Sequence, residues 1–358
     1  MPDVRPPRRS RCRDVDGRVL AIAAVIGVTA LVVARRLATA RLRHDGQPPG
    51  VRADDGVLLH TEVDENTTAP VTVVLSHGFA VRAEAFAPLR RALGPRARLV
   101  LVEHRGHHRS GWAGRRRIGL RRLGRDLGAV VDACADGRPV VLVGHSLGAL
   151  AALALAGDRP ELFGGRVRGV ALLSGSSGLL PAHRLPRLAM RAVAALRLRP
   201  VVRALVWLLS PLADLVPPTR LPGADRAVRR FVFGPAPVAP GTVAEAEEMW
   251  RRTPKAQVAQ LLPRALFFDS ARYLDVLSRV PTLVLSGAAD AVFPARHARA
   301  LAAGAGDRAR LVLVDGGGHM VPLSHPEPVA AALEDLLTRV EADLGGAAPR
   351  ADGRGVGE

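Results

Sequence analysis

The chain has little of what several protein classes require. Its 358 residues include only two cysteines, Cys12 and Cys134, which are too few for a disulfide framework or a cysteine zinc site. Aromatic residues make up 3% of the chain and no nucleic-acid recognition motif is present, so nucleic acid is not an expected partner. The sequence has no glycine-rich phosphate-binding loop and no long internal repeat. With these classes set aside, the length and composition of the chain predict one large globular domain with attached segments.

A sharp turn between a strand and a helix is the strongest signal in the sequence. An apolar run of β type ends in Gly144-His145-Ser146-Leu147-Gly148 and continues as a helical Ala/Leu pattern. In such a Gly-x-Ser-x-Gly turn the serine hydroxyl stands clear of the sheet, and the residues two before and two after it must be small. Gly144 and Gly148 satisfy this steric demand, and the Leu147 N–H points to where an oxyanion would form. Ser146 is therefore the predicted nucleophile.

An activated serine needs a histidine base and a carboxylate that orients the base. Two later runs have strand character, 281–286 and 309–314, and each leads into a suitable side chain. Asp290 follows the first run and His319 follows the second, which is the expected order of acid and base. We predict that Asp290 and His319 act on Ser146.

These assignments have alternatives. Asp290 has a second interpretation as the cap of a helix expected near Pro294. Asp315 is a rival acid, although it lies too close to the end of its strand to reach around the imidazole. His325 is typical of a helix N-terminus rather than of a base.

A second buried strand, at 71–76, opens into His77-Gly78-Phe79. The His-Gly turn allows the Phe79 N–H to serve as the second oxyanion donor. His77 itself is interpreted as a structural hydrogen-bonding residue, because the role of the base is already filled.

As a set, these motifs resemble those of α/β-hydrolases of the single-domain, lidded esterase and lipase type. The resemblance covers about residues 56–342. It implies an α/β fold with a doubly wound, mostly parallel sheet, in agreement with the alternating strand and helix patterns. The nucleophile, acid, base and two oxyanion donors of that family fall on Ser146, Asp290, His319, Leu147 and Phe79. Dehalogenases and epoxide hydrolases of this fold need a carboxylate nucleophile, so the serine excludes them.

One loop departs from the family pattern Asp-x-Arg-Gly-x-Gly-x-Ser. Here it reads Glu-His-Arg-Gly-His-His-Arg-Ser over residues 103–110. The acidic position is Glu103, and the second glycine is replaced by His108. Histidine tolerates positive φ better than most residues, so we expect the turn to be retained.

Residues 178–280 contain no convincing strand, but several helical patterns separated by prolines. A connection of this length is unusual in such a sheet, and the family inserts a lid here. We predict a helical lid at 178–280 between two parts of the hydrolase core, 49–177 and 281–344. The tail 345–358 is rich in glycine, alanine and charge and is expected to be disordered.

The N-terminal arm, residues 1–48, contains an uncharged, mostly aliphatic run at 19–34. We favour an uncleaved membrane anchor for this run, because arginines at both ends can reach the interface. A cleaved signal peptide and a run packed on the protein's own core are the alternatives. The balance of flanking arginines favours a catalytic domain outside the cytoplasm, with a secreted or a cytoplasmic enzyme as the alternatives.

Positive charge is concentrated in two segments. The chain has a formal net charge of +18, and residues 178–280 contain 16 basic and 7 acidic residues. The arm 1–48 contains 10 basic and 4 acidic residues. Because nucleic acid is not expected, an anionic membrane surface is the predicted partner of this charge.

The sequence therefore predicts a membrane-associated serine hydrolase that cleaves carboxylic esters with an apolar acyl or alcohol part through an acyl-enzyme. This chemistry needs no metal and no organic cofactor. A thioesterase or acyltransferase could use the same residues. A hydrolase-like binding protein without turnover is the alternative of another class, and the complete set of three catalytic residues argues against it.

Overall fold

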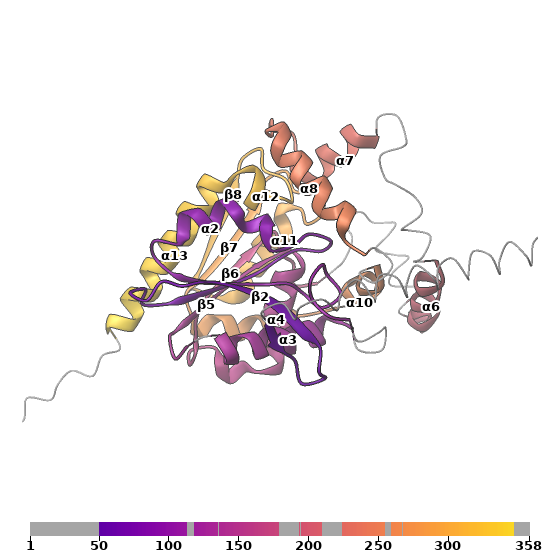
Figure 1. Cartoon of the computed structure of the whole chain (residues 1–358). Coiled ribbons are helices and arrows are strands. Elements are labelled where there is room, and N and C mark those ends of the chain that lie inside the picture. The colour runs from indigo at the N-terminus through magenta and orange to yellow at the C-terminus, as the bar shows by residue number, and fades with distance from the viewer. Residues whose placement is uncertain are drawn as a thin grey trace, which may run out of the picture. The chain divides into compact units, whose positions relative to one another are not determined.

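An eight-stranded sheet organises the chain (Figure 1). The structure is a computed structural model that describes residues 50–112, 118–134, 136–178, 193, 195–209, 224–254, 259–266 and 268–346. In sheet order, the strands are β1 (Gly50–Arg52), β2 (Leu58–Asp64), β4 (Arg98–Val102), β3 (Thr72–Ser76), β5 (Val140–His145), β6 (Val167–Leu173), β7 (Thr282–Gly287) and β8 (Ala309–Val314). The pairs β1–β2 and β2–β4 are antiparallel and the other pairs are parallel, which confirms the predicted mostly parallel sheet.

The central strands are short runs of Val and Leu that are buried on both faces, as parallel sheets require. Their register brings the carboxyl ends of β3 and β5 together, because Ser76 pairs with Gly144. At the far side, Gly287 of β7 pairs with Val314 of β8. The segments that follow β3, β5, β7 and β8 therefore leave the sheet at the same edge, where α/β proteins build their sites.

Helices cover both faces of the sheet, which confirms the doubly wound fold. One face packs against α3 (Leu120–Cys134), α4 (Leu147–Asp158), α11 (Ala295–Ala305) and the 3₁₀ helix η6 (Ala271–Arg279). The other face packs against α2 (Ala87–Leu93) and α13 (Pro326–Gly346). Short elements complete the core: η1 (Ala83–Phe86), η3 (Pro160–Leu162) and α12 (Val321–Ser324).

A close helix contact supports α4, the helix that follows the predicted nucleophile. Its Ala/Leu sequence is buried on nearly all sides, because α4 packs against α3, β5 and η6. A Cβ atom on Gly124 of α3 would lie 2.7 Å from the backbone nitrogen of Leu155, so only glycine fits at this contact. This packing fixes the axis of α4 and with it the start of the helix at the site.

The connection from β6 to β7 is long and helical. It contains α6 (Arg199–Leu209), α7 (Ala224–Phe233), α8 (Pro240–Arg252), η5 (Ala259–Leu261) and α10 (Leu262–Leu266), and its described part has no strand. A bridge between Gly178 and Asp269 joins its two ends, so we name residues 179–268 the insertion. Beyond this bridge, η6 packs on α4 and α11 of the core, although its residues lie within the predicted lid range 178–280.

Several predicted segments lie outside the described residues. These are the arm 1–48 with its apolar run 19–34, the tail beyond Gly346, and parts of the insertion. Helix α13 ends at Gly346, so the first two residues of the predicted tail are helical. Among the helices of the described ranges, none is both long enough and apolar enough to cross a membrane.

Candidate active site

The turn that carries Ser146 is held in a strained conformation. Ser146 has φ 52° and ψ −106°, between the end of β5 and the start of α4. A Cβ atom on Gly144 would lie 2.5 Å from the nitrogen of Ala149, and one on Gly148 would lie 1.9 Å from the carbonyl oxygen of Ser76. Side chains at these two positions would collide with the backbone, so the tight turn requires both glycines. Backbone strain of this kind is typical of functional sites.

Three of the predicted site residues form a continuous chain of polar contacts. The Nε2 atom of His319 lies 2.8 Å from Ser146 Oγ, and its Nδ1 atom lies 2.9 Å from Asp290 Oδ2. All three side chains are buried. Because the carboxylate accepts a hydrogen bond from Nδ1–H, Nε2 is the nitrogen that can accept the serine proton. This arrangement can activate the hydroxyl for attack on a carbonyl carbon.

The other oxygen of Asp290 organises its own loop. Its Oδ1 atom accepts hydrogen bonds from the N–H groups of Val292 and Phe293, both at 2.8 Å. These bonds form a turn that ends before α11, so the carboxylate combines the turn-forming role considered above with its contact to His319. Asp315, the rival acid, follows β8 directly and is exposed.

The segment after β3 lies beside the serine turn. A Cβ atom on Gly78 would lie 2.8 Å from the His145 ring, so the glycine permits this close approach. Phe79 follows Gly78, and Leu147 is the first residue of α4. No residue in the described ranges accepts a hydrogen bond from the N–H of Phe79 or Leu147. Both N–H groups are thus available to a substrate oxygen.

The sequence that forms this site matches a known family. A family model described as the alpha/beta hydrolase family matches residues 73–332. The chain belongs to the alpha/beta hydrolase family. This hydrolase is 30% identical over 271 residues to the pimeloyl-acyl-carrier-protein methyl ester esterase of Xanthomonas campestris pv. campestris strain B100, an alignment that covers 74% of this chain and 94% of that protein.

Solved structures share the fold of this hydrolase. One is a thermophilic esterase from Thermogutta terrifontis, with a TM-score of 0.64 and 21% identity over 82% of this chain and 99% of that one. Another is the enol-lactonase from Burkholderia xenovorans LB400, with a TM-score of 0.63 and 22% identity over 81% of this chain and 100% of that one.

The loop that departs from the family pattern retains a tight turn in this hydrolase. Gly106 has φ 76° and His108 has φ 36°, so the histidine adopts the conformation expected for the missing glycine. The longer acidic side chain is fully buried, and the Glu103 carboxylate accepts hydrogen bonds from the backbone N–H (2.9 Å) and the guanidinium (2.7 Å) of Arg109. The substitution of Glu for Asp is thus accommodated within the loop.

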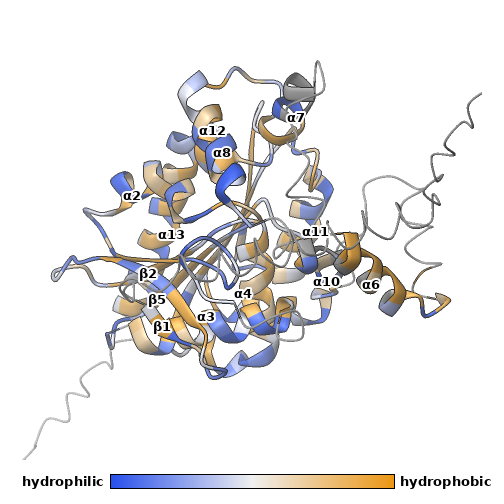
Figure 2. Cartoon of the chain, turned by 45° about the vertical axis from the view of Figure 1, so that its right-hand side comes forward, coloured by the Kyte–Doolittle hydropathy of each residue, from blue (hydrophilic) through white to orange (hydrophobic). Residues whose placement is uncertain are grey.

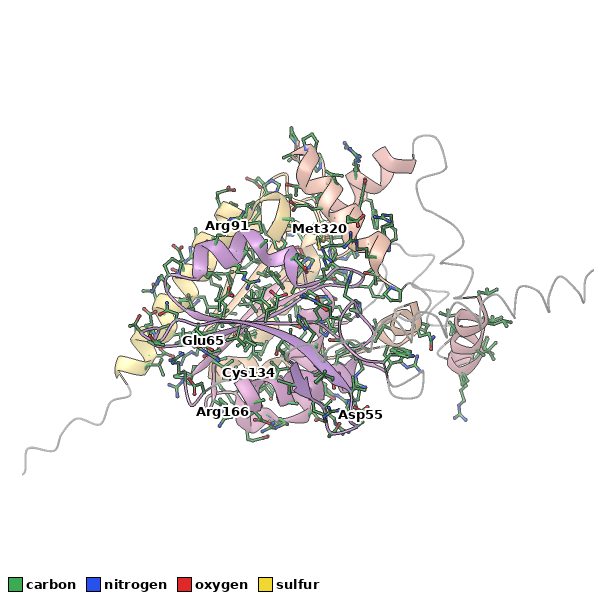
Figure 3. All side chains as sticks on the ribbon, viewed as in Figure 1. Asp55, Glu65, Arg91, Cys134, Arg166 and Met320 are labelled. Atoms are coloured by element: carbon green, nitrogen blue, oxygen red, sulfur yellow. The ribbon has the colours of Figure 1, made fainter. Side chains whose placement is uncertain are left out.

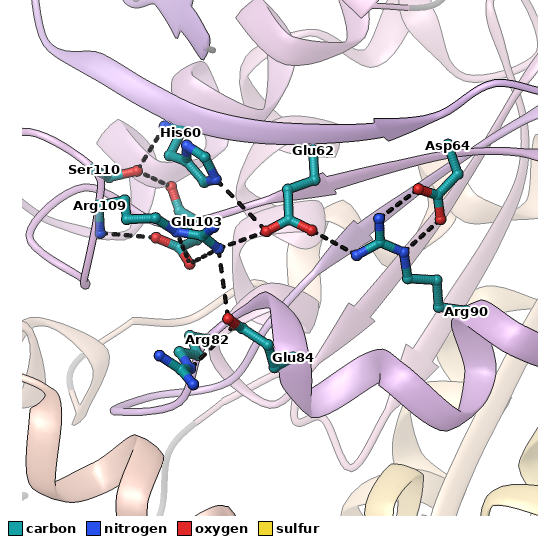
Figure 4. Close-up of polar contacts among 9 residues, drawn as sticks. All are labelled: His60, Glu62, Asp64, Arg82, Glu84, Arg90, Glu103, Arg109 and Ser110. Carbon is teal, nitrogen blue, oxygen red and sulfur yellow. Dashed lines mark hydrogen bonds and ion pairs between the residues drawn. The ribbon is translucent and has the colours of Figure 1, made fainter. Parts of the chain in front are cut away.

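An ion-pair network ties this loop to the sheet (Figure 4). Glu62 on β2 accepts from Arg109 at 2.6 Å and from Arg90 of α2 at 2.5 Å. Arg90 also pairs with Asp64 on the same strand. Because these groups are partly exposed, each pair contributes little to stability, but together they connect the loop, β2 and α2.

Sequence reasoning missed the role of a buried histidine next to the nucleophile. The Nε2 atom of His145 lies 2.9 Å from the carbonyl oxygen of His319, and the two ring centroids are 5.3 Å apart. Burial lowers the pKa of His145 to about 3, so its neutral ring donates Nε2–H to this carbonyl. The contact orients the segment that carries the base. Its position inside the Gly-x-Ser-x-Gly motif is visible in the sequence, but its partner is not.

Four buried histidines and the half-buried His108 lie around the site, and desolvation is the main cause that lowers the pKa of each. The pKa falls to about 4 for His104 and His108 and to about 3 for His107 and His145. The pKa of His77 is also well below its ordinary range. His77 accepts a hydrogen bond from the backbone N–H of His104 at 3.1 Å, in line with the structural role predicted for it.

Stability is expected to fall steeply as the pH drops below about 6.5, the pKa of an unfolded histidine. The unfolded chain then takes up protons that the folded protein excludes, until the pH reaches the lowered pKa values near 4 to 3. Each histidine contributes up to about 1.4 kcal/mol per pH unit in this window. Urea unfolding between pH 8 and pH 4.5 measures the slope. The variant His145→Gln should bind about one proton fewer on unfolding, and a flat wild-type profile would contradict the expectation.

Proposed function

We propose that this hydrolase is a serine esterase that forms an acyl-enzyme on Ser146. The observation that carries the proposal is the chain of contacts from Ser146 through His319 to Asp290, at 2.8 and 2.9 Å. These distances allow direct proton transfer from the hydroxyl to the imidazole. The sequence identity to an esterase that acts on a methyl ester supports the same reaction class.

The reaction begins when Ser146 Oγ attacks the ester carbonyl carbon and its proton passes to His319 Nε2. The carbonyl oxygen becomes an oxyanion, which the Phe79 and Leu147 N–H groups stabilise. Asp290 holds the imidazole in the correct tautomer and stabilises the imidazolium. The intermediate then collapses, and the leaving alcohol takes the proton from Nε2.

Hydrolysis of the acyl-enzyme completes the cycle. His319 removes a proton from water, the hydroxide attacks the acyl carbonyl carbon, and the proton then returns to Ser146 Oγ as the carboxylic acid leaves. No metal or organic cofactor takes part in this scheme. A thioesterase would use the same steps with a thiol as leaving group, and an acyltransferase would replace water with another acceptor.

The substrate class we propose is esters with a substantial apolar acyl or alcohol part. Aromatic side chains support this choice, because Phe293 lies 5.4 Å from the His319 ring and Phe79 is 38% exposed beside the nucleophile. A pocket for an ester is typically apolar with a few polar groups.

Hydrolysis of an ester series from two to sixteen acyl carbons tests this function. We expect turnover of esters, with kcat/KM rising beyond the shortest acyl chains, because additional methylenes bury apolar area. Matched thioesters and amides of one acyl chain separate the reaction classes. Faster cleavage of the thioester beyond its intrinsic reactivity would favour a thioesterase, and no turnover of any acyl compound would contradict the proposal.

An anionic lipid surface is the partner that we propose for the insertion. Helix α6 is largely hydrophobic in sequence, as its orange ribbon in Figure 2 shows. Five apolar side chains of this helix and of the residues before it are at least half exposed: Leu196, Val201, Leu205, Leu208 and Leu209. Most of these lie at helical spacing and form one outward face. Together with the basic excess of residues 178–280, this face suits a membrane interface, where apolar side chains insert and arginines meet anionic headgroups.

Cosedimentation with vesicles tests this partner. A chain shortened to begin at Asp45 should bind vesicles containing anionic lipid at low salt and release at physiological salt, because electrostatic attraction is then screened beyond about 8 to 10 Å. The variant Leu205→Glu should weaken binding, whereas the matched change Val63→Glu on β2 should not. Absence of binding at low salt would mean that the arginines form only a solvated surface. The full-length chain should remain bound in high salt if 19–34 is an anchor.

A further inference from the structure

Helices α7 and α8 of the insertion contact the loop that carries His319. The backbone N–H of Met320 donates to the carbonyl oxygen of Val232 at 3.0 Å, and Figure 3 shows Met320 beside these helices. A Cβ atom on Gly318 would lie 2.3 Å from the carbonyl carbon of Phe233. An apolar cluster unites α7 and α8 with η1 and α12; its buried members are Val81, Ala85, Phe233, Val243, Met249, Met320 and Leu323. This part of the insertion is packed against the site.

The end of α8 also contacts the segment that follows β3, residues 77–82, which we call the oxyanion segment because it contains Phe79. Thr253 is the C-cap of α8 and is 2% exposed. Its Oγ1 atom lies 2.9 Å from the carbonyl oxygen of Ala80 and 2.9 Å from that of Met249. His108 Nε2 lies 2.9 Å from the same hydroxyl. One threonine therefore joins the end of α8, the oxyanion segment and the atypical histidine of the loop 103–110.

The number of protons available determines which group donates in each of these three hydrogen bonds. A hydroxyl has one proton to donate and two lone pairs to accept with. Since neither carbonyl oxygen can donate, the hydroxyl directs its one proton between the carbonyl oxygens of Ala80 and Met249 in a three-centre bond, and the neutral His108 ring donates Nε2–H to Oγ1. The ring is neutral because burial lowers the pKa of His108 to about 4. His108 thereby orients the hydroxyl of Thr253 toward the carbonyl groups.

Ala80 needs this support. Its φ of 59° lies in the left-handed region, which is unfavourable for a non-glycine residue and persists only where the surroundings hold it. Its N–H donates to His107 Nε2 at 3.3 Å and its carbonyl oxygen faces Thr253. Both polar backbone groups of Ala80 are thus held from outside its segment, and the preceding residue is Phe79, whose N–H is the proposed oxyanion donor.

We propose that Thr253 and His108 are positioning residues, through which α8 fixes Ala80 and thereby aims the Phe79 N–H at the oxyanion. The inference rests on the proposed esterase function and adds a role for the insertion within it: α7 and α8 form a brace for the catalytic loops. Loss of the hydroxyl frees the strained Ala80, and the donor moves away from the oxyanion position. An interaction made mainly in the transition state should then weaken.

The pair Thr253→Val and Thr253→Ser tests this brace, because valine keeps the shape of threonine without its hydroxyl and serine keeps the hydroxyl. We expect Thr253→Val to lower kcat roughly tenfold to a hundredfold with little change in KM, as for a small misplacement of a catalytic group. Affinity for a trifluoromethyl ketone, which forms a tetrahedral adduct with the serine, should fall by a similar factor. Thr253→Ser should stay within about twofold of the wild type.

His108→Gly supplies an independent variant, since glycine removes the bond to Thr253 and accepts the positive φ. Its effect and that of Thr253→Val should not add in the double variant, because both break one connection. Amide hydrogen exchange over residues 77–82 should rise in both single variants and not in Thr253→Ser. This measurement does not depend on turnover.

The outcomes separate the brace from the proposed function. An active wild type whose Thr253→Val variant matches Thr253→Ser in kcat and in amide exchange would overturn the brace and leave the esterase standing. A wild type that cleaves no ester would overturn the esterase function and the oxyanion role of Phe79. If, in that case, amide hydrogen exchange over residues 77–82 is also the same in Thr253→Val as in the wild type, the contact between α8 and Ala80 would be overturned as well.

Discussion

Replacement of Ser146 by alanine is expected to abolish covalent labelling by a fluorophosphonate and to reduce ester turnover by about 10⁴- to 10⁶-fold. The hydroxyl is the only group of the contact chain that can form the acyl-enzyme, so no neighbouring side chain replaces it. His319 and Asp290 remain in place in the variant, but they have no nucleophile to activate.

The measurement compares labelling and initial rates at equal concentrations of folded protein. The alanine variant should keep its thermal unfolding transition, since it removes one oxygen from a buried side chain. Ser278→Ala is a matched control, because Ser278 lies on η6, where its hydroxyl donates to Asp275 O at 2.6 Å. Equal labelling of the wild type and Ser146→Ala would show that another residue is the nucleophile.

Asp290→Asn is expected to lower turnover by about 10⁴-fold, whereas Asp315→Asn should have little effect. The asparagine oxygen can keep the hydrogen bonds from the N–H groups of Val292 and Phe293. Its NH₂ group then faces His319 Nδ1 and donates to it. The ring must carry its proton on Nε2 instead, so it can no longer accept the proton of Ser146.

The pair of variants decides between the two carboxylates. Steady-state kinetics with one ester measures kcat/KM for both, and circular dichroism checks that both are folded. Asp315 is exposed after β8, so its variant controls for a change of charge at the same edge of the sheet. A larger loss in Asp315→Asn than in Asp290→Asn would show that the carboxylate contact to His319 is not the functional one.

The sequence could predict the parts of this site that depend on neighbouring residues along the chain. The strands are continuous apolar runs, and the serine turn demands glycines at fixed spacing, so both leave local patterns. The prediction that Asp290 and His319 follow two later strands used the order of the family. The mostly parallel, doubly wound sheet is confirmed because the alternation of strands and helices determines which topologies are available.

Contacts between distant segments could not be predicted in the same way. Thr253 lies 145 positions from His108 along the chain and belongs to no motif, so no pattern links the two. In the loop 103–110, the sequence shows that Glu103 and His108 differ from the family pattern. The residues that accommodate these two side chains are known only from the packing in the structure. Likewise, helical spacing alone did not distinguish η6, which packs on the core, from the helices that precede it.

The bridge between Gly178 and Asp269 gives the insertion adjacent points of departure and return. An inserted segment attached in this way can be exchanged during evolution without disturbing the order of the strands. The bond from Thr253 to Ala80 limits that freedom. A descendant that acquires a different insertion must also change the oxyanion segment, with glycine in place of Ala80 as the simplest remedy. A change of the insertion and a change at residue 80 are therefore expected to occur together.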